Sequence, residues 1–273
     1  MKPIGAPSVP TRCPACGRRP ARLTARIQAC DYCDSTWQRT PGGPSAFAAS
    51  PQARWAIRAA SAPGGRSLRT SLSLGILASR TALTDAFELA RYLSDAVAET
   101  VIVIDADEVP RTEAPPRTRV RARPLAGHFG AQRTALQRSA TAPWMLQLDT
   151  DEIIARESLA RLPAVLLAAE RAGILALGLP RRNHVDGAMS DHYPDPQYRL
   201  CRRSVAYEGR VHERPRLLSR ARQSRLALGL HIDHYLDAGR VRARTQRYGA
   251  MSDGATDTAR QRDERALLTP FCP

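Results

Sequence analysis

The sequence predicts an α/β domain with a largely parallel sheet, preceded by a small cysteine-ligated module and followed by a basic helical tail. Strand-like apolar runs alternate with amphipathic segments after residue 70, two of those runs end in clustered acids, and paired cysteines stand near the N-terminus. Alternation of strands and helices is typical of a parallel sheet covered by helices. We therefore expect the acids to lie at one edge of this sheet.

Composition fits one medium domain plus a smaller module, since 43% of the 273 residues are hydrophobic. The formal net charge of +15 invites a nucleic-acid interpretation. Lys2 is the only lysine, however, and the arginines are spread along a chain rich in Ala and Pro, a bias typical of GC-rich coding sequence. Charge therefore does not predict nucleic-acid binding, and nucleic acid is not an expected partner.

No segment has the character of a targeting signal or a membrane span. The first ten residues, MKPIGAPSVP, hold no apolar core, and the most apolar later stretch, 164–179, is interrupted by Glu170 and Arg171. We expect a cytoplasmic protein without a transmembrane segment, a location that is compatible with peripheral membrane contact.

Four cysteines form two C-x2-C pairs separated by thirteen residues: Cys13, Cys16, Cys30 and Cys33. Two such pairs supply four thiolates to a tetrahedral zinc ion, whereas disulfides would need an oxidising compartment. The pattern predicts a structural zinc ribbon over residues 1–40. With four protein ligands the site is closed, so the zinc would stabilise folding and not take part in catalysis. The ribbon would either recognise an acceptor or partner, or pack as a structural cap.

The remaining elements follow from local pattern. Residues 41–69 are rich in Pro, Gly, Ser and Ala and predict a linker with one short helix around Trp55. A domain over 70–236 and a basic helical tail over 237–273 follow, and Thr84 is the expected N-cap of the first helix of the domain. In order, the expected elements are strand 71–78, helix 84–96, strand 100–108, strand 118–124, helix 128–140, strand 143–149, helix 156–172 and strand 173–182.

Two predicted strands end in acids. Asp105 begins one acidic cluster, and Asp149, Asp151 and Glu152 form the other. Ligands of α/β sheets gather at the carboxyl ends of the strands, and paired carboxylates repel each other unless a cation lies between them. Capping of the following helix would account for one acid but not for three. The sequence therefore predicts a Mg²⁺ or Mn²⁺ site at this edge.

Four segments in series resemble the glycosyltransferase family 2 enzymes of GT-A fold, a Rossmann-like α/β fold. The closest branch is that of the lipopolysaccharide-core and peptide glycosyltransferases. The resemblance extends from about Leu72 to Tyr248. The segments are VIVIDADE (101–108), GHFGAQRTALQRSATAPWMLQLDTDE (127–152), HYPDPQYRLCRR (192–203) and YEGRVHERP (207–215).

The resemblance implies roles for individual residues. Asp105 would contact the nucleotide base or ribose, and Asp195 would be the general base, with Glu213 as its competitor. The remaining implied positions are the metal ligands Asp149, Asp151, His212 and His234, the donor-binding or loop-supporting residues Gln132 and Arg133, the diphosphate-binding residues Arg199 and Arg203, and Asp149 in a second role toward the ribose or a metal-bound water.

The predicted function is a metal-dependent, inverting hexosyltransferase. Its donor would be a nucleotide sugar, with a UDP-sugar as the first choice, and its acceptor a glycan, a lipid-linked molecule or a peptide. The alternative from another class is a zinc-ribbon nucleic-acid-binding protein with a catalytically degenerate α/β domain. A metal-dependent nuclease would also use carboxylates, but it does not account for the P-D-x-Q-x-R-L and V-H-E segments.

Overall fold

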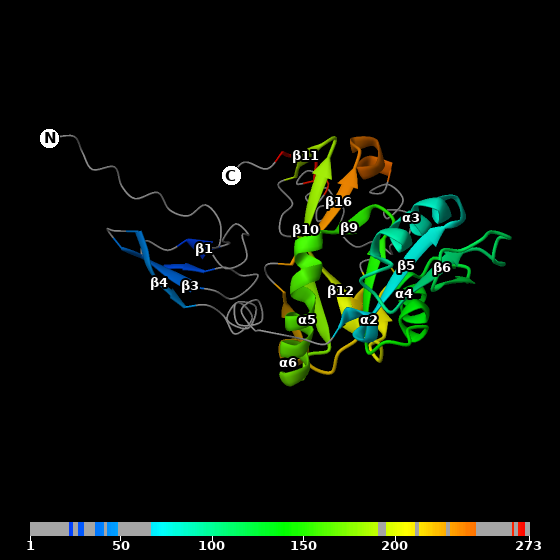
Figure 1. The fold of residues 1–273 in the computed structure, drawn as a ribbon. Helices are drawn as coiled ribbons and strands as arrows, with labels where there is room; N and C mark the ends of the chain where they lie inside the picture. The colour runs from blue at the N-terminus through cyan, green and yellow to red at the C-terminus, as the bar shows by residue number, and fades with distance from the viewer. Residues whose placement is uncertain are drawn as a thin grey trace.

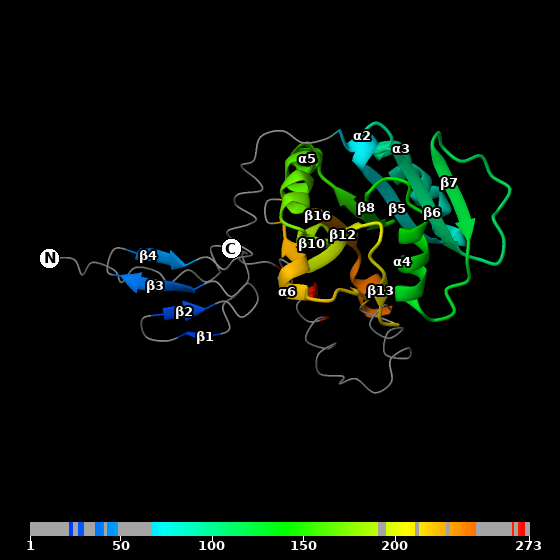
Figure 2. The same cartoon turned by 90° about the horizontal axis from the view of Figure 1, so that it is seen from below.

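The computed structural model describes residues 67–190, 195–210, 213–227 and 230–243, with 264 and 267–270 near the C-terminus. Before residue 67 it describes the four strands of an antiparallel sheet, ordered β1-β2-β3-β4 (Figure 2). The four predicted zinc ligands and the expected helix around Trp55 lie outside the described residues. The strands are β1 Arg22–Leu23, β2 Ile27–Ala29, β3 Thr36–Thr40 and β4 Gly43–Ala48.

The N-terminal sheet crosses the predicted boundary at residue 40. β4 pairs with β3 in antiparallel register, with Trp37 opposite Phe47 and Thr40 opposite Gly43. Within the Pro-Gly-Gly-Pro stretch that suggested a linker, Gly43 and Pro44 instead begin β4. The start of the predicted linker therefore belongs to this sheet.

From residue 67 onward the chain forms a mixed α/β domain built on an open ten-stranded sheet (Figure 1). Residues 238–243 are helical, at the start of the predicted tail. The elements are α2 Leu68–Ser71, β5 Leu72–Ser79, η1 Arg80–Ala82, α3 Leu83–Leu93, β6 Glu99–Asp105, β7 Thr118–Ala122, α4 Phe129–Arg138, β8 Trp144–Asp149, β9 Glu152–Ile154, α5 Arg156–Arg171, β10 Ala176–Val185, β11 Ala188–Met189, β12 Pro196–Arg202, β13 Tyr207–Glu208, β14 Arg214–Pro215, α6 Arg220–Gln223, β15 Ser224–Leu226 and β16 Ile232–Leu236.

The sheet is parallel in one half and mixed in the other. Its order is β7-β6-β5-β8-β12-β10-β16-β9, and the first four strands are parallel to one another. β12 is antiparallel to both of its neighbours, and β9 is antiparallel to β16. The prediction of a largely parallel sheet is therefore correct for β7 to β8 and for the pairs that β10 forms with β15 and β16, whereas β12 runs antiparallel between β8 and β10.

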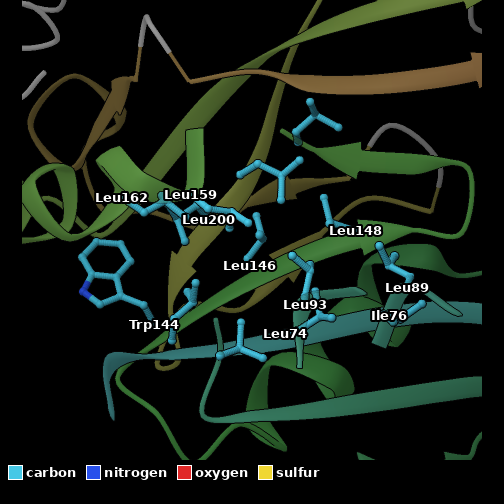
Figure 3. Packing of buried hydrophobic residues seen from close by; sticks show 14 of the residues in the cluster. Leu74, Ile76, Leu89, Leu93, Trp144, Leu146, Leu148, Leu159, Leu162 and Leu200 are labelled. Atoms are coloured by element: carbon cyan, nitrogen blue, oxygen red, sulfur yellow. The ribbon is translucent and has the colours of Figure 1, made fainter. Parts of the chain in front are cut away.

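Helices cover both faces of the parallel half. α3 and α5 pack on one face, where alternate residues of β5 and β8 join a large apolar cluster with them (Figure 3). α4 packs on the other face, where Leu136 meets Val101, Val103 and Met145. Because successive side chains of a strand point to opposite faces of the sheet, each strand contributes apolar residues to the hydrophobic clusters on both faces. The side chains labelled in Figure 3 are Leu74, Ile76, Leu89, Leu93, Trp144, Leu146, Leu148, Leu159, Leu162 and Leu200.

The expected N-cap of the first helix is wrong. α3 begins at Leu83, its N-cap is Ala82, and no side chain caps it. The 3-10 turn η1 leads directly into the helix, so Thr84 already lies in the first turn.

The start of α4 is fastened to the loop after β13. The backbone N–H groups of Phe129 and Gly130 donate to the carbonyls of Arg210 and Gly209, at 2.9 and 3.1 Å. Thr134 exchanges hydrogen bonds with the backbone of Tyr207, one turn further along. Loop carbonyls therefore satisfy helix N–H groups that have no partner within the helix.

This close approach explains the glycine at position 130. A Cβ built there would lie 2.5 Å from the carbonyl oxygen of Gly209 and 3.0 Å from the carbonyl carbon of Glu208. A Cβ at Gly75 would instead meet the ends of two side chains, Met145 Sδ at 2.7 Å and Leu136 Cδ2 at 3.1 Å. Side-chain ends can move aside, whereas the backbone of a pinned loop cannot.

We therefore expect Gly130→Ala to lower the free energy of unfolding by about 1–3 kcal/mol, the usual cost of overpacking. Gly75→Ala is the matched control and should cost less. Urea unfolding of both purified variants measures the difference. If Gly130→Ala lowered the free energy of unfolding by no more than Gly75→Ala does, the loop after β13 would have to move aside easily, and its contact would not hold the helix.

Candidate functional site

Two of the predicted acids lie at the same edge of the sheet. β5 pairs in parallel with both β6 and β8, and its register places Ser79 beside Asp105 and Leu77 beside Asp149. Two strand spacings, about 10 Å, separate the strands that carry these acids. Asp105 accepts a hydrogen bond of 2.8 Å from the Leu125 N–H through Oδ1, which joins the end of β6 to the segment after β7. The expected convergence at the carboxyl edge is confirmed.

The third acid of the D-T-D-E turn organises the turn from within. The side chain of Glu152 is fully buried, and its Oε2 accepts from the backbone N–H of Asp149 at 3.2 Å. Its Oε1 accepts from Arg199 Nη2 at 2.7 Å and from Arg181 Nη1 at 2.8 Å. Glu152 therefore joins the loop after β8 to β10 and β12 and is not available to a ligand.

Asp149 lies between two arginines. Arg133 Nη2, from α4, donates to Oδ1 at 3.0 Å and to Oδ2 at 3.2 Å, and Arg199 Nη2 also donates to Oδ2. Arg133 Nε donates in turn to Glu213 Oε1, so helix α4 and the loop before β14 meet at one guanidinium group. Both oxygens of Asp149 are thus engaged by cations.

Asp195 closes the other end of the chain of ion pairs. Its Oδ2 accepts from Arg181 Nε at 2.9 Å, from Arg181 Nη2 at 2.6 Å and from Asn183 Nδ2 at 3.1 Å. Its Oδ1 accepts from Gln197 Nε2 at 2.8 Å. Both of its oxygens are held by donors on the two neighbouring strands β10 and β12.

The arginines keep these carboxylates ionised in spite of burial. Burial raises the pKa of Glu152, but the charges of Arg199 and Arg181 outweigh it and lower that pKa to about 2. Burial likewise raises the pKa of Asp149, and the charges of Arg133 and Arg199 bring it below its ordinary value. Opposite charges at hydrogen-bonding distance favour the ionised form enough to offset desolvation.

His234 joins the same site from β16. Its Nε2 lies 3.5 Å from Asp151 Oδ2, and its Nδ1 lies 2.7 Å from Asn183 Oδ1. His234 is 2% exposed, whereas about a third of the Asp151 side chain remains accessible. Asp151 is thus a partly accessible acid of the turn that lies beside a histidine nitrogen.

The site carries an excess of negative charge in a strongly basic chain. Its five carboxylates face three guanidinium groups, so these eight side chains sum to a net charge of −2. Among the described residues no group of three or more His, Cys, Asp and Glu side chains is arranged to hold a metal ion. The acids are Asp149, Asp151, Glu152, Asp195 and Glu213, and the arginines are Arg133, Arg181 and Arg199.

Two predicted donor-binding residues have other positions. Gln132 is buried, and its amide exchanges hydrogen bonds with the side chain and the carbonyl of Arg123, so it supports the segment after β7. Arg203 follows β12 beside the start of β8, with its backbone N–H bonded to the Pro143 carbonyl. Because Asp149 ends that strand, Arg203 lies at the opposite edge of the sheet and is removed from the site. His212 lies outside the described residues.

Sequence reasoning missed Arg181 and Asn183 and took Glu152 for part of a metal-binding cluster. Arg181 interrupts an otherwise apolar strand, 176–180, with a charge, and a charge inside a buried strand must be paired. The sequence therefore contained evidence that Arg181 has ion-pair partners. It did not indicate which residues those partners are, because they belong to other segments of the chain.

Comparison with known proteins identifies no family. No family model matches the chain, and no curated protein matches it. Among solved structures, S. aureus TarS aligns at 12% identity and a TM-score of 0.36, covering 72% of this chain and 43% of that one. The 2-C-methyl-D-erythritol 4-phosphate cytidylyltransferase from Thermus thermophilus aligns at 19% identity and a TM-score of 0.26, covering 73% and 86%. This chain thus spans less than half of TarS, and at these scores neither likeness establishes a function.

Within the described residues, no helix is both long enough and apolar enough to cross a membrane.

The ion pairs of Glu152 make the free energy of unfolding depend on pH. The pKa of Glu152 is about 2 in the folded chain against 4.5 ordinarily, so the folded state binds fewer protons between these values. Its stabilisation is complete above about pH 4.5 and is lost as the pH falls toward about 2, a change on the order of 3 kcal/mol. Glu152→Gln should remove this part of the pH dependence and should cost about 3–5 kcal/mol near neutral pH.

Urea unfolding at a series of pH values measures both effects. The control is Glu88→Gln, an exposed acid of α3, which should keep the wild-type slope. If the Glu152 variant showed the same slope as the wild type in this window, the buried ion pairs would not be the source of the acid sensitivity.

Proposed function

We propose that the chain is a metal-dependent, inverting glycosyltransferase that moves a sugar from a nucleoside diphosphate donor to an acceptor hydroxyl. The observation that carries the proposal is the site at the carboxyl edge of the parallel strands, where Asp151 and His234 face each other beside a net charge of −2. The four motif segments that resemble glycosyltransferase family 2 supply most of the residues of this site. A donor diphosphate is itself negatively charged, and a divalent cation would offset the repulsion between the diphosphate and the carboxylates of the site.

The residues fit a divalent cation at Asp151 rather than at Asp149. Asp149 gives both oxygens to Arg133 and Arg199, whereas Asp151 Oδ2 and His234 Nε2 lie close enough to share one ion. Mg²⁺ and Mn²⁺ keep several waters and take their other ligands from substrate phosphates, so two protein ligands suffice. When bound, the cation would stabilise the charge of the departing diphosphate. Asp149 then acts by holding the arginines.

Donor recognition would fall to the neighbouring strand ends. Asp105, at the end of β6, is exposed and lies about 10 Å from the cation-binding end of β8, a separation suited to the ribose or base of the donor. A UDP-sugar is the first donor to test. Arg199 lies beside Asp149 at this edge, where its guanidinium charge would favour the diphosphate.

Glu213 is the better candidate for the general base. Asp195 is about 10% exposed, and both of its oxygens already accept hydrogen bonds, from Arg181, Asn183 and Gln197, within an ion pair that disfavours its protonation. Glu213 bonds Arg133 through Oε1, and Oε2 has no hydrogen bond to any described residue. In transfer, the acceptor oxygen would attack the anomeric carbon, its proton would pass to Glu213, and the sugar–phosphate bond would break with its electron pair leaving on the nucleotide.

The N-terminal module would recognise the acceptor. Cys13, Cys16, Cys30 and Cys33 would bind structural zinc, and the residues that build the donor site all lie after residue 70. The acceptor, whether glycan, lipid-linked or peptide, would then be recognised apart from the donor.

A donor screen tests the function. Hydrolysis of nucleotide sugars in the presence of Mn²⁺, followed by thermal-shift titration with the corresponding nucleoside diphosphates, should reveal one preferred donor. Duplex DNA at two salt concentrations is the contrasting ligand. Salt-sensitive DNA binding without any nucleotide response would favour a nucleic-acid-binding protein with a degenerate domain instead.

Asp151→Asn should abolish Mn²⁺-dependent nucleotide binding and transfer while the fold stays intact, because the amide keeps the shape but loses the charge that holds the cation. Asp107→Asn is the matched control, since Asp105 and Asp107 form a second D-x-D sequence at the end of β6. Calorimetric titration of UDP with and without Mn²⁺ distinguishes the Asp151→Asn variant from the Asp107→Asn control. Full turnover in the Asp151 variant would remove this residue from the mechanism.

Glu213→Gln should lower turnover by about 10²-fold or more with donor binding close to that of the wild type, because loss of a general base acts on the chemical step. The glutamine can still accept from Arg133, so the site keeps its shape. Asp195→Asn should instead lower thermal stability and weaken Mn²⁺ binding. The reverse assignment, a loss of turnover alone in Asp195→Asn, would restore Asp195 as the base.

A further inference from the structure

The orientation of the Asn183 amide is set by its carboxylate neighbour. Asp195 is ion-paired with Arg181 through Oδ2, so that oxygen acts only as an acceptor. The Asn183 side-chain atom that faces it at 3.1 Å must therefore be the Nδ2 donor. Asn183 is fully buried, which leaves its amide no water to turn toward. Its Oδ1 then points the opposite way, to His234.

This orientation decides which nitrogen of His234 carries the proton. Asn183 Oδ1 can only accept, so His234 Nδ1, 2.7 Å away, must donate. In the Nδ1–H tautomer Nε2 carries a lone pair, and Nε2 lies 3.5 Å from Asp151 Oδ2. Two acceptors facing each other repel, unless a cation binds to both.

We propose that Asn183 is a positioning residue that fixes the Nδ1–H tautomer of His234, so that Nε2 and Asp151 together present lone pairs to one divalent cation. The inference rests on the proposed function, because the cation is the one that the transferase would use. Asn183 and His234 are register partners on the adjacent strands β10 and β16, so strand pairing holds the hydrogen bond in place. Through Asp195 and Arg181 the same hydrogen bonds continue to Glu152 in the acidic turn.

This arrangement also gives Asp195 a role. A histidine that binds a metal commonly donates its other N–H to an acceptor that fixes the ring, and loss of that acceptor weakens metal binding. Here the acceptor is an amide, and Asp195 is what keeps that amide from turning over. Asp195 thus acts on the cation through two side chains.

The variant that tests the inference is Asn183→Leu, which removes the acceptor with little change in volume. His184→Gln is the control on the same strand: alternation points position 184 to the other side of β10, and glutamine can still donate to Asp233. Mn²⁺ affinity is measured by calorimetry in the presence of UDP. The tautomer of His234 is read by nitrogen NMR of the cation-free protein at about pH 8, above the ordinary pKa of histidine, with His234→Gln identifying the signal.

We expect an Nδ1–H ring in the wild type, loss of that tautomer in Asn183→Leu, and an Mn²⁺ Kd that rises by about 10- to 100-fold in this variant only. A proton on Nε2 in the wild type, in a neutral or a charged ring, would overturn the inference, and the NMR result does not depend on whether the variant folds. Unchanged Mn²⁺ affinity in a folded Asn183→Leu protein would also overturn it. A wild type that binds no Mn²⁺ with nucleotide would instead refute the proposed function.

Discussion

The buried carboxylate of Glu152 is the centre on which the site depends. It is inaccessible to water, and two guanidinium groups and one backbone N–H supply the hydrogen bonds that water would have given. Taking a charge out of water costs several kcal/mol, so the carboxylate is stable only while Arg181 and Arg199 stay in place. Those arginines belong to β10 and β12, the strands that join the parallel half of the sheet to the rest. The same interaction thus closes the acidic turn and orders the sheet around it.

This pairing separates the acids of the turn by role. Glu152 is buried between arginines, Asp149 is ion-paired with Arg133 and Arg199, and the carboxylate of Asp151 lies 3.5 Å from a histidine nitrogen. The residues are adjacent in sequence, yet their electrostatic surroundings differ because three separate segments supply the positive charges. A chain of alternating charges also resists displacement, since moving one guanidinium group leaves two carboxylates uncompensated. The site is therefore organised before any ligand arrives.

Local pattern predicted the elements well and their partners poorly. The alternation of apolar and polar residues located β5, α3, β6, α4 and β8, and the parallel register of β5 explains why Asp105 and Asp149 share an edge. The antiparallel return of β12 could not be read, because apolar content says nothing about strand direction. The resemblance implied that Asp195 is a base, but a motif does not show the arginine and the two amides that donate hydrogen bonds to it.

The charge balance links the arrangement to a ligand of definite chemistry. A net charge of −2 at the edge of a chain that carries +15 overall is costly unless something positive compensates it. A basic protein with so many arginines could have placed one more beside Asp151, and it places a histidine there instead. An arginine would neutralise the site permanently, whereas a histidine nitrogen with a lone pair would allow a cation to bind and dissociate together with the diphosphate. Under the proposed function, such a site would bind its anionic donor only together with the metal, which would make the cation a condition of donor binding as well as of chemistry.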